Sequence, residues 1–165
     1  MASVKTITYL SLGSNVGDRE ANLREAISRL AELGTISKTS SFYETEPMEL
    51  TGQQWFINCA LELDTTMSAQ ELMHGLLEIE RGMGRERDRN IAKGPRKIDI
   101  DILLYGDAVI DEPGLKVPHP AMHKRRFVLA PLAEIDAEVI HPVLERSVGE
   151  LLDELPESAG KVRKI

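Results

Sequence analysis

Residues 97–105, KIDIDILLY, constrain the fold more than any other segment of the chain. Side chains alternate between the two faces of a β-strand, so the three isoleucines point one way and Asp99 and Asp101 the other. Isoleucine side chains are stabilised by burial, whereas carboxylates need water or a cation. The segment therefore predicts a strand of a sheet whose two faces have different surroundings.

The two aspartates are the first candidate for chemistry. Two strand rises place them roughly 6.6 Å apart along the backbone. Like charges at that separation are unfavourable unless a cation lies between them, and Mg²⁺ commonly takes one or two carboxylates together with phosphate oxygens and water. The alternative is an amphipathic strand with a wet acidic face. The preceding GPRK, residues 94–97, favours metal and phosphate chemistry.

Hydrophobic periodicity predicts the order β-α-β-β-α-β, followed by helical segments. We expect the first helix to contain apolar residues from Leu23 to Leu33 and to end at Gly34, and the second to cover residues 69–81 and end at Gly82. Ser68 with Glu71 predicts a capping box at the start of the second helix, and Ser147 with Glu150 predicts another at the start of a last short helix. This order is typical of an α+β, ferredoxin-like sandwich with one mainly antiparallel sheet and C-terminal helical additions. The predicted strands are residues 6–12, 36–44, 55–64 and 97–105, and the predicted helical additions are residues 128–135 and a short helix after Ser147.

The 165 residues contain no linker or repeat, so we expect a single domain over residues 1–165 with a frayed tail from about residue 157. The one cysteine, Cys59, excludes a disulfide framework, fits a reducing compartment and is interpreted as a buried small hydrophobe. No apolar run is long enough for a membrane span, and no signal peptide is recognised. We therefore expect a cytoplasmic protein without a membrane partner.

The net charge of −7 hides two basic segments. Residues 84–97 carry +4 and residues 123–126 carry +3, which leaves −14 on the rest of the chain. Clustered positive charge attracts an anionic ligand, although solvated arginine-rich loops would give the same pattern. The acidic remainder argues against nucleic acid as a partner. A P-loop is excluded because Gly13 and Gly17 are not followed by a Gly-Lys-Ser/Thr sequence.

Three further residues could contribute to a site. His119 lies in the sequence VPHP, where a loop hydrogen bond is the alternative to a catalytic role. Phe56 and Asn58 share one face of their strand by alternation. An aromatic ring beside an amide suits a flat heterocycle, although core and edge positions would also account for both residues.

These motifs together resemble the 6-hydroxymethyl-7,8-dihydropterin pyrophosphokinase family of folate biosynthesis. The resemblance runs from about Thr8 to Leu152. It departs from the usual family pattern at Lys93, Glu46 and Pro120. The segments that carry it are YLSLGSNVGDREANL, SSFYETEP, FINCALEL, GPRKIDIDILLYG and VPHPAMHKRRFVLAPL, in this order.

The resemblance implies a ferredoxin-like enzyme that transfers the β,γ-pyrophosphoryl group of ATP to the pterin hydroxymethyl oxygen. The products would be AMP and the pterin diphosphate. The only partners would be the small-molecule substrates, ATP and 6-hydroxymethyl-7,8-dihydropterin, and the enzyme would be a monomer. It implies that Asp99 and Asp101 hold two Mg²⁺ ions and act in catalysis with Arg85 and Arg96. Implied ATP-binding residues are Glu80, Arg85, Arg96, Ile102, His119 and Arg125, and implied pterin-binding residues are Thr45, Glu46, Pro47, Met48, Phe56, Asn58 and Phe127.

Two other functions fit the residues. A non-catalytic ferredoxin-like module that binds a small ligand would need neither ATP nor the aspartate pair. A different Mg²⁺-dependent nucleotide transferase would need both, but would act on another acceptor.

Overall fold

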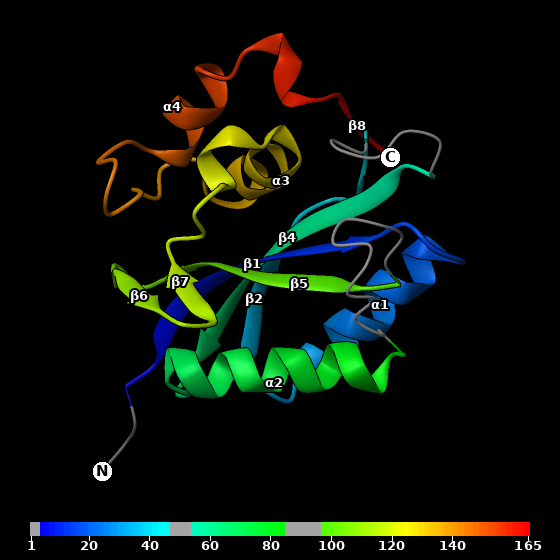
Figure 1. Cartoon of the computed structure of the whole chain (residues 1–165), viewed down its shortest axis with the longest axis vertical. Coiled ribbons are helices and arrows are strands. Elements are labelled where there is room, and N and C mark those ends of the chain that lie inside the picture. The colour runs from blue at the N-terminus through cyan, green and yellow to red at the C-terminus, as the bar shows by residue number, and fades with distance from the viewer. Residues whose placement is uncertain (1–3, 47–53, 85–96) are drawn as a thin grey trace.

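The computed structural model describes residues 4–46, 54–84 and 97–165 (Figure 1). The strands are β1 (Thr6–Ser14), β2 (Thr35–Thr39), β3 (Tyr43–Thr45), β4 (Phe56–Thr65), β5 (Asp99–Tyr105), β6 (Ile110–Glu112), β7 (Leu115–Val117) and β8 (Val162–Lys164). The helices are α1 (Arg19–Leu30), α2 (Ala69–Gly82), α3 (Arg126–Asp136) and α4 (Val148–Asp153), with 3₁₀ turns at Met122–Lys124 and Glu157–Ala159.

The main sheet has the order β5-β1-β4-β3-β8, and β2 also pairs with β4. Every pairing in it is antiparallel. The strands before and after α1 are therefore separated by β4, which is the split β-α-β arrangement. This topology confirms the predicted ferredoxin-like α+β class, and α3 and α4 are the expected C-terminal additions.

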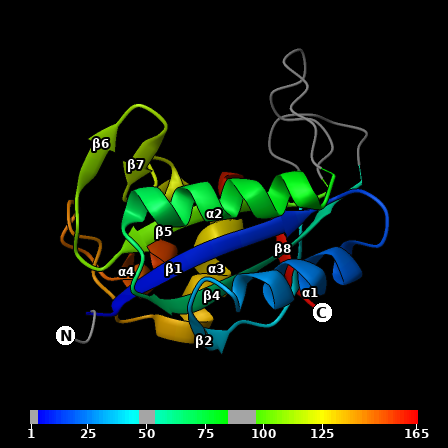
Figure 2. The ribbon, with the colours of Figure 1, turned by 90° about the horizontal axis from the view of Figure 1, so that it is seen from below.

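Helices cover both faces of the sheet. Figure 1 shows α1 and α2 below it and α3 and α4 above, and Figure 2 shows α1 and α2 side by side across the lower face. Leu10 and Leu12 of β1 point into the core beneath α1 and α2, whereas Tyr9 belongs to the core beneath α3 and α4. Cys59 is fully buried in the first of these cores, as predicted.

The first helix ends earlier than predicted. It begins at Arg19 because the carboxylate of Asp18 accepts a hydrogen bond from the backbone N–H of Ala21, and it ends at Leu30. Gly34 does not end this helix. A Cβ at Gly34 would lie 2.4 Å from the carbonyl oxygen of Asp64, so glycine is required there by close approach to β4.

The second helix confirms its predicted start. Ser68 and Glu71 form a reciprocal capping box. The helix includes Gly82, which was expected to end it. Gly84 has a φ of +87° two residues later, where a C′ glycine is favoured. The same capping signal at Ser147 also correctly marks the start of α4.

The strand expected at residues 36–44 is two strands, β2 and β3. The break falls at Ser40, whose side-chain oxygen accepts the backbone N–H of Ala60 at 2.9 Å. A side chain thus takes the place of a ladder carbonyl, which interrupts the regular strand.

The C-terminal tail does not fray as expected. Residues 162–164 form β8, which pairs with β3. The guanidinium of Arg126 donates to the carbonyls of Gly160, at 2.5 Å, and Pro156, at 2.9 Å. A strand pairing and hydrogen bonds from the half-buried Arg126 therefore hold a segment whose polar composition indicated disorder. Within the described ranges, none of the helices has the length and apolar character needed to cross a membrane.

Candidate active site

The predicted carboxylate pair lies on the sheet face that also carries α3. Ile98, Ile100 and Ile102 are buried beneath α1 and α2, and Asp99 and Asp101 point to the opposite side, half-buried. The alternation inferred from the sequence is therefore confirmed.

The sheet register places residues of three strands in one row on this face. Gly13 of β1 lies opposite Asp99 of β5 on one side and opposite Asn58 of β4 on the other. Ser11 lies opposite Asp101 in the next row of this face. The acidic pair and the amide are thus separated only by β1, which has small residues at both positions.

His119 lies close enough to both Asp99 and Arg125 for the charge of each to act on its imidazole. The backbone N–H of His119 donates to the Leu103 carbonyl of β5 at 3.0 Å. The ring Nδ1 of His119 accepts the backbone N–H of Ala121 at 3.1 Å. Burial and the Arg125 charge lower the pKa of His119 to about 4, against a smaller opposing effect of Asp99. The imidazole is therefore neutral near pH 7 with its proton on Nε2, which leaves a hydrogen-bond donor there.

Two of the residues implied at the ATP site, Glu80 and Ile102, do not have their side chains on the sheet face that carries Asp99 and Asp101. Glu80 is buried on α2, and its carboxylate accepts the backbone N–H of Ile100 at 2.8 Å on the free edge of β5. The Ile102 side chain lies in the core beneath α1 and α2. The structure therefore does not bring the Ile102 side chain together with the aspartates. Only the backbone of Ile102 lies at the sheet edge formed by β5.

Four residues implied at the pterin site meet where β3 and β4 pair. Thr45 lies opposite Phe56, and its hydroxyl donates to Oδ1 of Asn58 at 2.5 Å. Asn58 Nδ2 donates to the Leu12 carbonyl at 3.2 Å. The backbone N–H of Glu46 donates to the Lys161 carbonyl at 3.0 Å.

Phe127 lies in the first turn of α3. The guanidinium of Arg125 is 5.5 Å from the centre of its ring. Helix α3 is held on the sheet by hydrogen bonds from Tyr9 to Asp136 and from Tyr43 to Glu134, both 2.5 Å long. Both acceptors lie in the last turn of α3, so these contacts hold its C-terminal end against β1 and β3. Arg85, Arg96, Pro47 and Met48, together with Lys93, lie outside the described residues.

The carboxylate pair suits a hard divalent cation that takes its other ligands from a substrate. Asp99 and Asp101 supply oxygen donors from adjacent positions on one strand face. No group of three or more His, Cys, Asp or Glu in the described ranges could hold a metal ion. A site built by protein ligands alone is therefore not found in that part of the chain, whereas a shared site with phosphate oxygens fits.

Sequence reasoning missed the part played by Gly13. A Cβ at this position would lie 2.5 Å from Asn58 Nδ2 and 3.4 Å from Phe56 Cδ1. A glycine inside a predicted strand is the signal that could have found it, since such glycines commonly mark the close approach of another group. Arg19 and Asn15 were also missed, and no local pattern distinguishes them.

The fold and the site define a ferredoxin-like α+β protein that presents a carboxylate pair and an aromatic–amide pair on one sheet face, with a neutral imidazole near the carboxylates. The family model for 7,8-dihydro-6-hydroxymethylpterin-pyrophosphokinase (HPPK) matches residues 9–137. The chain therefore belongs to the HPPK family.

Curated relatives agree with this assignment. The 2-amino-4-hydroxy-6-hydroxymethyldihydropteridine pyrophosphokinase of Bacillus subtilis is 44% identical over 138 residues, which cover 82% of this chain and 81% of that protein. The protein of the same name from Aquifex aeolicus is 43% identical over 146 residues, covering 88% and 90%. The folic acid synthesis protein fol1 of Schizosaccharomyces pombe is 40% identical, but this chain spans only 20% of its length.

Solved structures share the fold. A structure of HPPK-DHPS in complex with substrates has a TM-score of 0.73 at 17% identity, with 90% of this chain and 43% of that chain covered. Plasmodium falciparum HPPK-DHPS with pteroate has a TM-score of 0.75 at 18% identity, with 93% and 43% covered. This chain thus corresponds to less than half of either protein.

Proposed function

We propose that this protein transfers pyrophosphate from ATP to 6-hydroxymethyl-7,8-dihydropterin, a step of tetrahydrofolate biosynthesis. One observation carries the proposal: Asp99 and Asp101 share a sheet face with the Thr45–Asn58 pair, and His119 lies within electrostatic reach of both Asp99 and Arg125. Family membership gives this arrangement its substrates, since the curated relatives bear the pyrophosphokinase name.

The β5 end of this face is proposed to hold the triphosphate. Asp99 and Asp101 would hold two Mg²⁺ ions, which shield phosphate charge and align an in-line displacement. His119 can donate from Nε2 to a phosphate oxygen without adding a charge, and Arg125 can add a charged hydrogen bond. Arg85 and Arg96 are proposed to complete this end, with Glu80 and the backbone of Ile102 on the adenosine side.

The β3–β4 end is proposed to hold the pterin. Among the described residues, the Asn58 amide uses one donor on the Leu12 carbonyl and one acceptor on the Thr45 hydroxyl. An amide has two of each, so one donor and one acceptor remain for the edge of a flat heterocycle. Phe56 and Phe127 are proposed to stack on the ring. Glu46, Pro47 and Met48 are proposed to line the same pocket.

The reaction needs no covalent protein intermediate. The hydroxymethyl oxygen attacks the β-phosphorus of ATP, the bond from that phosphorus to the α–β bridging oxygen breaks, and AMP leaves with that oxygen. The hydroxyl proton is released to water. The chain contributes position and charge, because the sheet fixes both ends of the site relative to each other.

The remaining properties follow from the same proposal. We propose that residues 1–165 form one domain that acts as a monomer in the cytoplasm, with no nucleic acid or membrane partner. A single buried thiol, Cys59, is compatible with a reducing compartment.

Asp101→Asn and Asp107→Asn form a matched pair that tests the site. Asp107 lies in the exposed turn just after β5, so its variant removes the same charge without touching the sheet face. With ATP, Mg²⁺ and the pterin, we expect AMP formation to fall at least about 100-fold in Asp101→Asn, because a metal ligand is lost, and to be unchanged in Asp107→Asn. Equal activity of the two variants would contradict the assignment, and the absence of ATP binding by the wild type would favour a non-catalytic module.

A further inference from the structure

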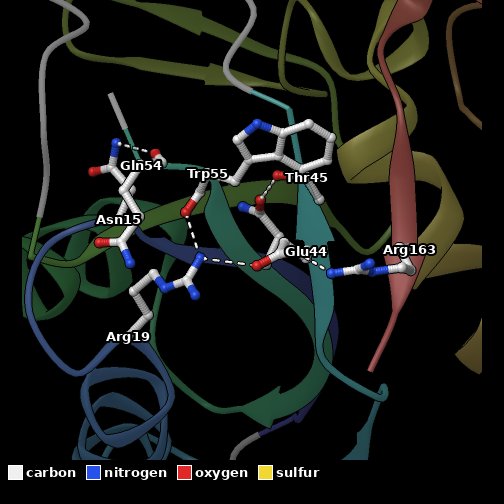
Figure 3. Close-up of polar contacts among 8 residues, drawn as sticks. Asn15, Arg19, Glu44, Thr45, Gln54, Trp55 and Arg163 are labelled. Carbon is white, nitrogen blue, oxygen red and sulfur yellow. Dashed lines mark hydrogen bonds and ion pairs between the residues drawn. The ribbon is translucent and has the colours of Figure 1, made fainter. Parts of the chain in front are cut away.

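The first residue of α1 and the connection before it, residues 15–18, contact both strand ends at the proposed pterin site (Figure 3). Nη1 of Arg19 donates to the Trp55 carbonyl at 2.7 Å and to Oε2 of Glu44 at 3.3 Å. Trp55 immediately precedes β4, and Glu44 is the central residue of β3. One guanidinium nitrogen therefore joins two segments that are distant in sequence from it and from each other.

A second side chain, from the connection between β1 and α1, contacts the carbonyl next to that of Trp55. Asn15 is buried, and its Nδ2 donates to the Gln54 carbonyl at 3.3 Å. The connection is itself held by Asn22, whose Nδ2 donates to the Ser14 hydroxyl at 3.1 Å and to the Val16 carbonyl at 2.8 Å. The contacts to Gln54 and Trp55 thus start from an ordered segment.

Arg19 acts from the side of the sheet opposite the proposed substrate. Its helix, α1, covers the face into which Leu10 and Leu12 point. On β3, Glu44 alternates with Tyr43 and Thr45, whose hydroxyls lie on the α3 face. Arg19 therefore reaches Thr45 only through Glu44, and Phe56 only through the Trp55 carbonyl.

The ion pair between Arg19 and Glu44 is largely shielded from solvent, although it lies near the edge of the sheet. The side chains of Arg19 and Glu44 are 18% and 22% exposed, whereas the pair of Arg24 with Glu20 on the same helix is 66% and 44% exposed. Glu44 also accepts a hydrogen bond from Arg163 of β8, so the C-terminal strand joins the same network. Sheltered charged hydrogen bonds contribute more than exposed pairs, which typically contribute little.

We propose that Arg19 is a positioning residue for the pterin half of the site. It fixes the β3 and β4 ends so that Thr45, Phe56 and Asn58 keep the geometry that reads the heterocycle. The ATP half, on β5 and around His119, lies across β1 from these contacts. This inference rests on the proposed function.

The test compares Arg19→Ala with Arg24→Ala in steady-state kinetics. Arg24 is a good control because its guanidinium lies 5.4 Å from the centre of the Phe42 ring, so its loss also removes a cation near β3 but no hydrogen bond to the strand ends. We expect Arg19→Ala to raise KM for the pterin about tenfold, with KM for ATP within about twofold of wild type. Arg24→Ala is expected to match wild type, and Arg19→Lys to fall between.

Amide hydrogen exchange of residues 43–46 and 55–58 gives a readout that does not depend on turnover. Faster exchange in Arg19→Ala than in Arg24→Ala is expected. Equal exchange in the two variants, or an equal rise of both KM values, would overturn the inference. Arg19→Lys allows the same comparison if Arg19→Ala does not fold. If the wild type forms no AMP, the proposed function fails instead, and the exchange comparison alone decides whether Arg19 orders the strand ends.

Discussion

Gly13→Ala tests the packing of the candidate site most sharply. Gly13 lies between Asp99 and Asn58 in the sheet register, and a Cβ there would meet Asn58 Nδ2 at 2.5 Å. Real Cβ atoms essentially never come closer than 3.0 Å to such an atom, so the amide must move. Because Asn58 is only 4% exposed, it cannot move into water without losing its partners.

The magnitude follows from the hydrogen bonds that the displaced amide gives up. Asn58 would lose the Leu12 carbonyl, at 3.2 Å, and the Thr45 hydroxyl, at 2.5 Å. Each buried polar group left unpaired costs about 1–3 kcal/mol. We expect Gly13→Ala to lower the free energy of unfolding by about 2–4 kcal/mol, partial rearrangement being included. Turnover with the pterin should fall at least about tenfold, because the amide no longer reads the ring.

Urea denaturation and steady-state kinetics on four proteins decide the matter: wild type, Gly13→Ala, Asn58→Ala and the double variant. Removing the amide removes the clash, so Gly13→Ala should cost little in the Asn58→Ala background, and the cycle should show a coupling of about 2 kcal/mol. Gly114→Ala is the control. Its φ of +81° and open surroundings predict a loss of about 1 kcal/mol with unchanged turnover. Equal destabilisation by Gly13→Ala in both backgrounds would refute the reasoning.

Three further predictions concern titration, burial and capping. Burial and Arg125 lower the pKa of His119 to about 4, so its stabilising contribution is complete above pH 6.5 and is lost as the pH falls towards 4. In metal-free buffer, His119→Gln should remove up to about 1.4 kcal/mol per pH unit from the acid slope of stability between those values. An unchanged slope would contradict this. Burial raises the pKa of the Cys59 thiol to about 12, so a disulfide reagent at pH 8 should label only the unfolded protein. Rapid labelling of the native protein would contradict the burial of Cys59. Ser68→Ala should cost about 1 kcal/mol in urea denaturation, because the capping box is lost, while turnover is retained; no loss of stability would argue against the cap.

The fold was predictable where a local signal determined the structure. The alternation of isoleucine and aspartate in residues 97–105 predicted both the strand and its two faces, and the two Ser–Glu capping boxes predicted the starts of α2 and α4. The prediction that Gly34 ends the first helix was wrong, because a glycine after a helix and a glycine required by close backbone approach look the same in sequence. The prediction of a frayed tail was wrong, because the tail is held by β3 and Arg126, which are distant from it in sequence.

The candidate site was predictable to a similar extent. Strand alternation placed Asp99 with Asp101, and Phe56 with Asn58, but it could not place one pair relative to the other. That relation depends on the register of both strands with β1, which is a long-range property. Arg19 was beyond reach for the same reason, since its partners Glu44 and Trp55 come from two other segments of the chain.

The central claim is that the group transferred from ATP is pyrophosphate. Phosphorus NMR of one sample containing the protein, ATP, Mg²⁺ and 6-hydroxymethyl-7,8-dihydropterin tests it directly. The account predicts AMP and a pterin product with two mutually coupled phosphorus resonances, formed in equal amounts. ADP with a pterin monophosphate, or ATP that remains unchanged, would contradict it.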